Sequence, residues 1–200
     1  VLLIISMVNY AALNLDRWIA AQSQTVEDFA LYSFIGTILI MGQSVQAVVN
    51  TSIYPLMTRC YARTNLINVF QLCLKISCCS LMFSMLLAIP SWWLLNEGIQ
   101  HWFPKYNDGL ELLSFMIFVA AVRISDFWTS FMIITGLENR LLFINIVAVV
   151  SSICLWVYWM QPWYYKNIEL IDIVLLAILL SSVNYILTAL ESWRSIRRKI

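Results

Sequence analysis

Charged residues are scarce in this chain, and the side chains on which most soluble active sites depend are scarcer still. Of the 200 residues, 12% are charged, whereas a soluble domain has roughly 25%. The five glycines form no phosphate-binding loop, and the single histidine, His101, stands in no Ser-His-Asp set and no metal-ligand spacing. The five cysteines are odd in number and lie in apolar runs, so we interpret them as small apolar side chains. We therefore expect no enzyme activity, no metal and no cofactor.

Apolar residues are abundant instead, at 62% of the chain. A helix needs about 20 mostly apolar residues to cross a bilayer. Six segments meet this requirement, and they predict an all-α, polytopic membrane protein whose residues 1–200 form a single bundle of six transmembrane helices. We expect the second span to end near Pro55, the third to kink at Pro90 and the fourth to stop at Gly136. The predicted spans are residues 1–21, 29–57, 69–95, 110–135, 141–159 and 170–190.

The basic residues predict how these spans are oriented. If the six spans alternate, eight basic residues fall on one side of the membrane and three on the other. The positive-inside rule makes the first side cytoplasmic and places the C-terminus there. We expect no nucleic-acid partner, because the basic residues lie at span ends rather than in one patch. The C-terminal basic residues are predicted to anchor the chain to anionic membrane lipids: Arg194, Arg197, Arg198 and Lys199.

Two charged residues interrupt the fourth predicted span. Arg123 and Asp126 are three residues apart within an otherwise apolar segment. In one continuous helix they would share a face and could pair, which would reduce the cost of burying them. Since a charge at bilayer depth is costly, both should face the protein interior or a watery cavity. They are candidates for lining a transport path, although a purely structural pair is also open.

The first predicted span carries a second acid–base set, Asp16 and Arg17. These side chains could reach the outer interface, because Trp18 follows directly. They could instead line a path together with Arg123 and Asp126. Arginine presents a planar fork that matches phosphate oxygens, so a cavity with both arginines would suit an anionic or pyrophosphate-bearing substrate.

Amide side chains form a polar stripe on the second predicted span. Gln43, Gln46 and Asn50 follow helical spacing, with Tyr54 next along the same face. Ser181 and Asn184 begin a comparable stripe on the last span. Such groups either join helices within the membrane or line a path. We count the three amides of the second span as candidate path residues.

Residues 14–19 read Asn-Leu-Asp-Arg-Trp-Ile, and residues 31–33 read Leu-Tyr-Ser. Together they resemble the junction of the seventh and eighth helices in the polysaccharide flippases. These are the O-antigen and lipid-linked oligosaccharide exporters of the multidrug/oligosaccharidyl-lipid/polysaccharide superfamily. Residues 53–59, Ile-Tyr-Pro-Leu-Met-Thr-Arg, resemble the end of its eighth helix. Residues 103–106, Phe-Pro-Lys-Tyr, resemble the turn before its tenth, with Pro104 in place of the usual glycine. Glu138 and Asn139 depart from its short basic turn.

The resemblance covers the whole chain, and it implies that this is the C-terminal six-helix half of a V-shaped, twelve-helix transporter. Such proteins move undecaprenyl-pyrophosphate-linked oligosaccharide across the bacterial inner membrane by alternating access, alongside other polysaccharide-assembly proteins. The resemblance also makes Asp16 or Asp126 a candidate proton site.

Three alternatives stay open. The first is a multidrug efflux transporter of the same superfamily, which would favour acidic and aromatic cavity residues. A membrane-embedded polysaccharide polymerase or glycosyltransferase would usually need a large outer loop, and the longest outer connection is residues 96–109. The third is a scaffold that transports nothing.

Overall fold

The computed structural model describes residues 2–160 and 168–198, and these residues form helices and short connections without a strand. The prediction of an all-α chain is confirmed for this described part. Among the elements, η1 is a short 3-10 helix and the rest are α-helices. The elements are α1 (Leu2–Ser23), α2 (Val26–Arg63), α3 (Leu66–Trp102), η1 (Pro104–Gly109), α4 (Leu110–Ile124), α5 (Trp128–Ile134), α6 (Glu138–Met160) and α7 (Leu170–Arg197).

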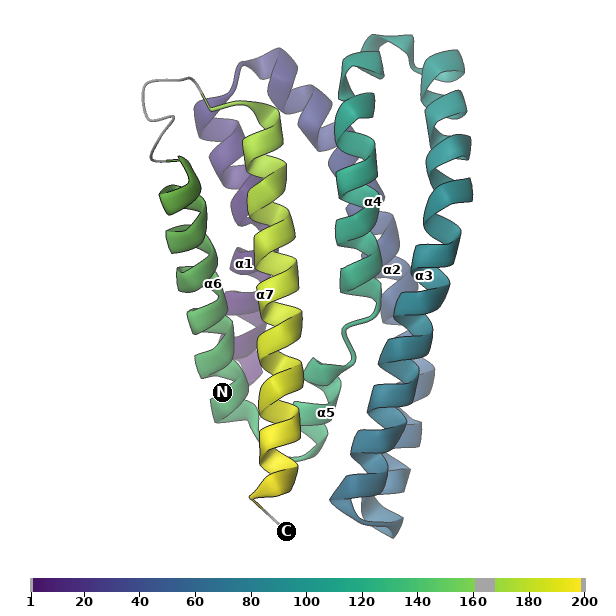
Figure 1. Ribbon diagram of the computed structural model, residues 1–200, viewed down its shortest axis with the longest axis vertical. Coiled ribbons are helices and arrows are strands. Elements are labelled where there is room, and N and C mark those ends of the chain that lie inside the picture. Colours follow the sequence, from purple (N-terminus) through teal and green to yellow (C-terminus); the bar gives the residue numbers. More distant parts are fainter. Residues whose placement is uncertain (1, 161–167, 199–200) are drawn as a thin grey trace.

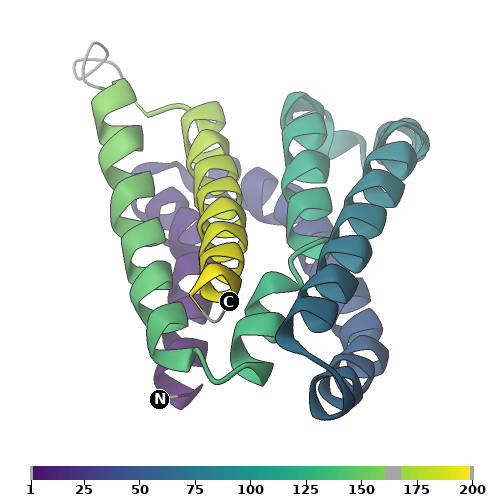
Figure 2. The ribbon, with the colours of Figure 1, turned by 60° about the horizontal axis from the view of Figure 1, so that its bottom comes forward.

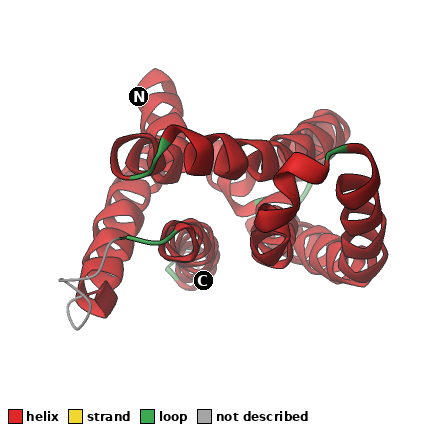
Figure 3. Cartoon of the chain, turned by 90° about the horizontal axis from the view of Figure 1, so that it is seen from above, coloured by secondary structure: helices red, strands yellow, loops and turns green. Residues whose placement is uncertain are grey.

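The long helices run up and down in two groups. Helices α1, α6 and α7 pack on one another, and α2, α3 and α4 form the second group, as Figure 1 and the end-on view of Figure 3 show. Contacts of α4 with α7 and of α1 with α2 join the groups. Both ends of the described chain, the α2–α3 turn and the α5–α6 turn lie at one end of the bundle (Figures 1 and 2). This alternation matches the order predicted from the sequence.

Among the described residues, four helices are long and apolar enough to cross a membrane: α2, α3, α6 and α7. The chain therefore has the character of a multi-pass membrane protein, while a six-span topology stays a prediction. Helix α2 does not end near Pro55, because it continues through that residue to Arg63. At about 1.5 Å per residue, a helix of 38 residues is longer than the roughly 30 Å thickness of a bilayer core.

The fourth predicted span is not one helix, and this part of the sequence prediction is wrong. Helix α4 ends at Ile124, and the seven-residue α5 begins at Trp128. Helix α5 then ends where expected: Gly136 has φ +71°, the amide of Leu137 donates to the Met132 carbonyl at 2.9 Å, and that of Gly136 donates to the Ile133 carbonyl at 3.1 Å. This is the Schellman arrangement, in which glycine accepts a left-handed conformation without strain.

The buried apolar residues fall into two clusters, one toward each end of the bundle. The first includes Tyr32, Leu39, Leu113 and Ala177, and the second is built around α5 and its neighbours. On each long helix that contributes to both clusters, polar residues lie between the two. The bundle thus has a polar middle enclosed by two apolar ends.

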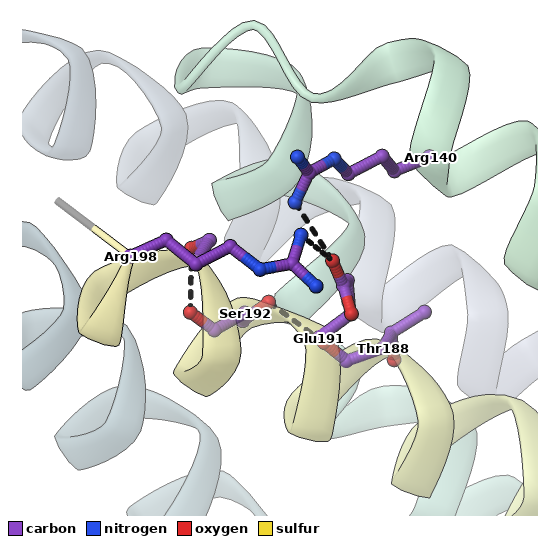
Figure 4. A network of polar contacts seen from close by, with 6 residues as sticks. Arg140, Thr188, Glu191, Ser192 and Arg198 are labelled. Atoms are coloured by element: carbon purple, nitrogen blue, oxygen red, sulfur yellow. Dashed lines mark hydrogen bonds and ion pairs between the residues drawn. The ribbon is translucent and has the colours of Figure 1, made fainter.

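One carboxylate ties the ends of α6 and α7 together. Glu191 Oε1 lies 2.9 Å from Nη1 of Arg140 and 3.6 Å from Nη1 of Arg198 (Figure 4). Of the residues predicted to anchor the chain to lipid, Arg198 thus has a partner within the protein, and Arg197 lies 4.1 Å from the centre of the Trp193 ring. Arg194, Arg197 and Arg198 are all exposed, whereas Lys199 lies outside the described residues.

Close packing of α2 against α4 yields a first prediction. A Cβ at Gly42 would come within 3.2 Å of the Ala120 Cβ and 3.3 Å of Ile124 Cδ1. We expect Gly42→Leu to lower the free energy of unfolding by about 1–3 kcal/mol, because the extra side chain overpacks this contact. Thermal unfolding of the detergent-solubilised protein measures the effect. Gly98→Leu is the matched control, since the nearest atoms there are in the Trp102 ring at 3.8 Å, and equal losses for both variants would contradict the packing argument.

Candidate functional site

A cavity of about 310 Å³ occupies the polar middle of the bundle. Its lining comes from α1, α2, α4, α5, α6 and α7 and from the break between α4 and α5. Arg123 and Asp126 contribute the two charges. The other polar lining residues are amides and hydroxyls: Asn9, Gln43, Gln46, Asn50, Thr129, Ser130, Asn145, Ser181 and Asn184.

Arg123 is the most deeply buried charge in this lining, with 7% of the residue exposed. Its Nε donates to Ser181 Oγ on α7 at 2.9 Å. Its Nη2 is buried and has no hydrogen-bond partner among the described residues. A buried donor without a partner is costly, and a guanidinium holds several donors in one plane. Arg123 therefore has unused capacity to bind an anion or a hydroxyl group in the cavity.

The break between α4 and α5 is stabilised by side chains from neighbouring helices. Three consecutive carbonyl groups in the break accept hydrogen bonds from side chains. The Ser125 and Phe127 carbonyls also accept backbone amides, those of Phe127 and Phe131, each at 3.1 Å, whereas the Asp126 carbonyl has no backbone donor among the described residues. Ser77 Oγ donates to the Ser125 carbonyl at 2.5 Å, and Cys73 Sγ donates to that of Phe127 at 3.5 Å. From α2, Gln46 Nε2 donates to the Asp126 carbonyl at 2.9 Å. Irregular backbone within an apolar bundle is tolerated only when its polar groups are satisfied in this way.

Asp126 lies in this break and faces α5 rather than Arg123. Its Oδ1 accepts the Trp128 backbone amide at 3.2 Å and its Oδ2 accepts the Thr129 hydroxyl at 3.3 Å. Asp126 therefore caps the start of α5. Within the described residues no ion pair joins it to Arg123, so the predicted pair is wrong. The physical reason is the break itself, which removes the helical spacing on which that prediction rested.

The amides in the lining are only partly satisfied. Asn145 Nδ2 donates to Asn9 Oδ1 at 2.8 Å, and the Ser130 hydroxyl donates to Asn50 Oδ1 at 3.1 Å. The side-chain oxygens of Asn145 and Asn184 are buried without a partner among the described residues. Such a set of amide donors and acceptors can bind a hydroxyl-rich ligand.

The other predicted acid–base set lies beside the cavity rather than in its lining. Asp16 is 1% exposed, and its Oδ2 accepts the Tyr32 hydroxyl at 2.5 Å. It does not reach the outer interface, so that interpretation of Asp16 is wrong. Arg17 Nη2 donates to the Gly36 carbonyl of α2 at 2.8 Å. Arg17 is thus used in helix packing.

The structure therefore brings five of the seven predicted path residues into one lining: Arg123, Asp126, Gln43, Gln46 and Asn50. Whether they form a substrate path stays a prediction. Sequence reasoning missed Asn9 and the role of Tyr32, which is apolar over most of its surface and gave no separate signal. The break could have been found, because Ser125 and Asp126 are residues that commonly begin a helix.

Comparison of the chain with protein-family models, with curated proteins and with solved structures found no match.

Gln46 yields a second prediction, because it joins the cavity to the break. We expect Gln46→Leu to lower the free energy of unfolding by about 1–3 kcal/mol, since the Asp126 carbonyl would lose the donor that the described residues give it. Gln43→Leu is the matched control: Gln43 lines the same cavity from the same helix and makes no hydrogen bond within the described residues. Unfolding midpoints in detergent compare the two variants. A Gln46 variant as stable as its control would show that the carbonyl does not need this donor.

Proposed function

We propose that this protein is a membrane transporter and that its central cavity forms part of the path of a polar, anionic substrate. The observation that carries the proposal is the state of Arg123: its buried Nη2 has no hydrogen-bond partner among the described residues, and the residue lines a cavity rich in amides. A charged side chain inside a membrane bundle is costly to retain. A substrate that carries phosphate would offset that cost, because phosphate oxygens can accept two parallel hydrogen bonds from a guanidinium group.

Two further features support transport. The α4–α5 region is a discontinuous helix at the level of the cavity, and many transporters place their substrate sites at such helices. In addition, four of the helices that the structure describes are long and apolar enough to span a membrane, and three of them, α2, α6 and α7, contribute to the cavity lining.

We propose more specifically that the substrate is undecaprenyl-pyrophosphate-linked oligosaccharide, an O-antigen or capsule repeat unit, moved across the bacterial inner membrane by alternating access. The guanidinium of Arg123 can bind the pyrophosphate, and the amide side chains of the lining can hydrogen-bond to the sugar hydroxyls. At about 310 Å³ the cavity is at the small end of ligand sites and would hold the pyrophosphate or one sugar at a time. This agrees with the resemblance to flippases, in which the chain is one lobe of two and its C-terminus is cytoplasmic.

Multidrug efflux fits the cavity less well. Drug sites are mostly apolar and aromatic, and the described residues that line this cavity include no aromatic side chain.

The test is Arg123→Ala in the full-length protein, expressed in a strain that lacks its own copy. We expect surface glycan to fall at least about tenfold, because removing one charged contact to phosphate commonly costs 1.5–3 kcal/mol. Glycan staining of whole cells measures the loss, and membrane fractionation checks that the variant still inserts.

Arg59→Ala is the matched control, since Arg59 is exposed near the α2–α3 turn, away from the cavity. Normal surface glycan in the Arg123 variant would remove this residue from the mechanism. Unchanged glycan with lost drug resistance would favour efflux instead.

A further inference from the structure

Three buried polar atoms of the cavity lining have no hydrogen-bond partner among the described residues, and they are of two kinds. One is a donor, Nη2 of Arg123. The other two are acceptors, the side-chain oxygens Oδ1 of Asn145 and Asn184. A buried polar atom that stays unsatisfied is destabilising. The lining is therefore complementary to a ligand that accepts a hydrogen bond at one point and donates hydrogen bonds at others.

The two acceptors belong to helices that pack on each other. Asn145, on α6, is 2% exposed, and its Nδ2 donates to Oδ1 of Asn9 on α1 at 2.8 Å. Helix α6 packs on both α1 and α7, and α7 carries Asn184. The bond to Asn9 uses the amide nitrogen of Asn145 and fixes the side chain, so its oxygen stays available to a ligand.

Ser181 connects the acceptors with Arg123. The Nε of Arg123 donates to Ser181 Oγ at 2.9 Å, and Asn184 follows three residues later on the same helix. Side chains three residues apart on a helix share a face, with their Cβ atoms roughly 5–6 Å apart. Asn184 thus lies one turn from the residue that holds the guanidinium. A short hydroxylated chain attached to an anion at Arg123 would reach it.

We propose that Asn145 and Asn184 are specificity-determining residues that accept hydrogen bonds from hydroxyl groups next to the anionic group of the substrate. This inference rests on the proposed function and narrows it: the substrate class is a phosphate ester that carries hydroxyls, rather than a bare phosphate. Deprotonated phosphate oxygens only accept hydrogen bonds, so they satisfy Arg123 and leave both amide oxygens without a donor. A site built to hydrogen-bond a hydroxyl rejects an analogue that lacks it, because buried groups of the site then stay unpaired.

Two phosphate monoesters with the same three-carbon chain test the proposal: glycerol 3-phosphate, which has two hydroxyls, and propyl phosphate, which has none. Calorimetry measures their binding to the full-length protein in nanodiscs of phosphatidylcholine. We expect wild type to bind glycerol 3-phosphate at least about tenfold more tightly than propyl phosphate. Asn184→Leu removes one acceptor at similar side-chain size. We expect it to reduce the preference by about threefold to tenfold, the value of one hydrogen bond, while propyl phosphate binds as before.

Asn14→Leu is the matched control and is expected to keep the wild-type preference. Asn14 lies outside the cavity lining, and its Nδ2 donates to the Tyr10 carbonyl of its own helix at 2.8 Å. Arg123→Ala is expected to weaken both esters by a similar factor, because both carry the anion. A merely structural role of Asn184 would shift the unfolding midpoint and leave the ratio of the two affinities unchanged.

Equal affinity of wild type for the two esters overturns the proposal, and so does an Asn184 variant that keeps the wild-type preference. If Asn184→Leu does not fold, Asn184→Ala, which adds no bulk, replaces it with the same expected loss. If wild type binds neither ester, the proposed anionic path fails and this inference fails with it. Binding of both esters without a preference, in contrast, leaves the path standing and removes only the inference.

The same chemistry occurs in free esters and in lipid headgroups, and the composition of the nanodiscs separates these sources. Phosphatidylglycerol presents a glycerol phosphate, whereas phosphatidic acid presents a phosphate without the hydroxylated group. Weaker binding of added glycerol 3-phosphate in nanodiscs with phosphatidylglycerol than in those with phosphatidic acid supports a lipid-borne substrate. Equal binding in the two supports a free ester.

Discussion

The structure depends on how the backbone of the break between α4 and α5 finds hydrogen-bond partners within an apolar bundle. The Asp126 carbonyl has no backbone donor among the described residues and accepts from Gln46 of α2, while the Ser125 and Phe127 carbonyls each accept a backbone amide and a side chain. Ser77 and Cys73 on α3 supply those two side-chain donors. Since three helices must meet at one height to do so, the break fixes where they lie against each other.

The same constraint produces the cavity. A continuous fourth helix would turn Arg123 and Asp126 to one face, where they could neutralise each other. The break instead lets Asp126 cap α5 and leaves Arg123 bonded to Ser181, with a buried Nη2 that has no partner among the described residues. Because Asp126 and Arg123 are kept apart, polar groups without a partner among the described residues remain between the two apolar clusters. These groups give the cavity its capacity to hydrogen-bond a ligand.

Much of the fold was predictable because hydrophobic length and periodicity are strong signals in this chain. They predicted the helical class and the alternation of the helices, and the glycine at 136 predicted the end of α5. The break was not predicted, because Ser125 and Asp126 are short polar residues inside an apolar run whose total length indicates a single span. In the site, the amides of α2 followed helical spacing and could be grouped from sequence. Asp16 could not be placed, because its position depends on a contact with Tyr32 across two helices.

The pairing of Glu191 with Arg140 and Arg198 also bears on how the bundle can move. A single carboxylate clamps the beginning of α6 to the end of α7, and these helices pack along their length. They would travel as a rigid pair in any rocking of the bundle. Motion between the two helix groups would instead have to change the contacts that join them, chiefly those of α4 with α7 and of α1 with α2.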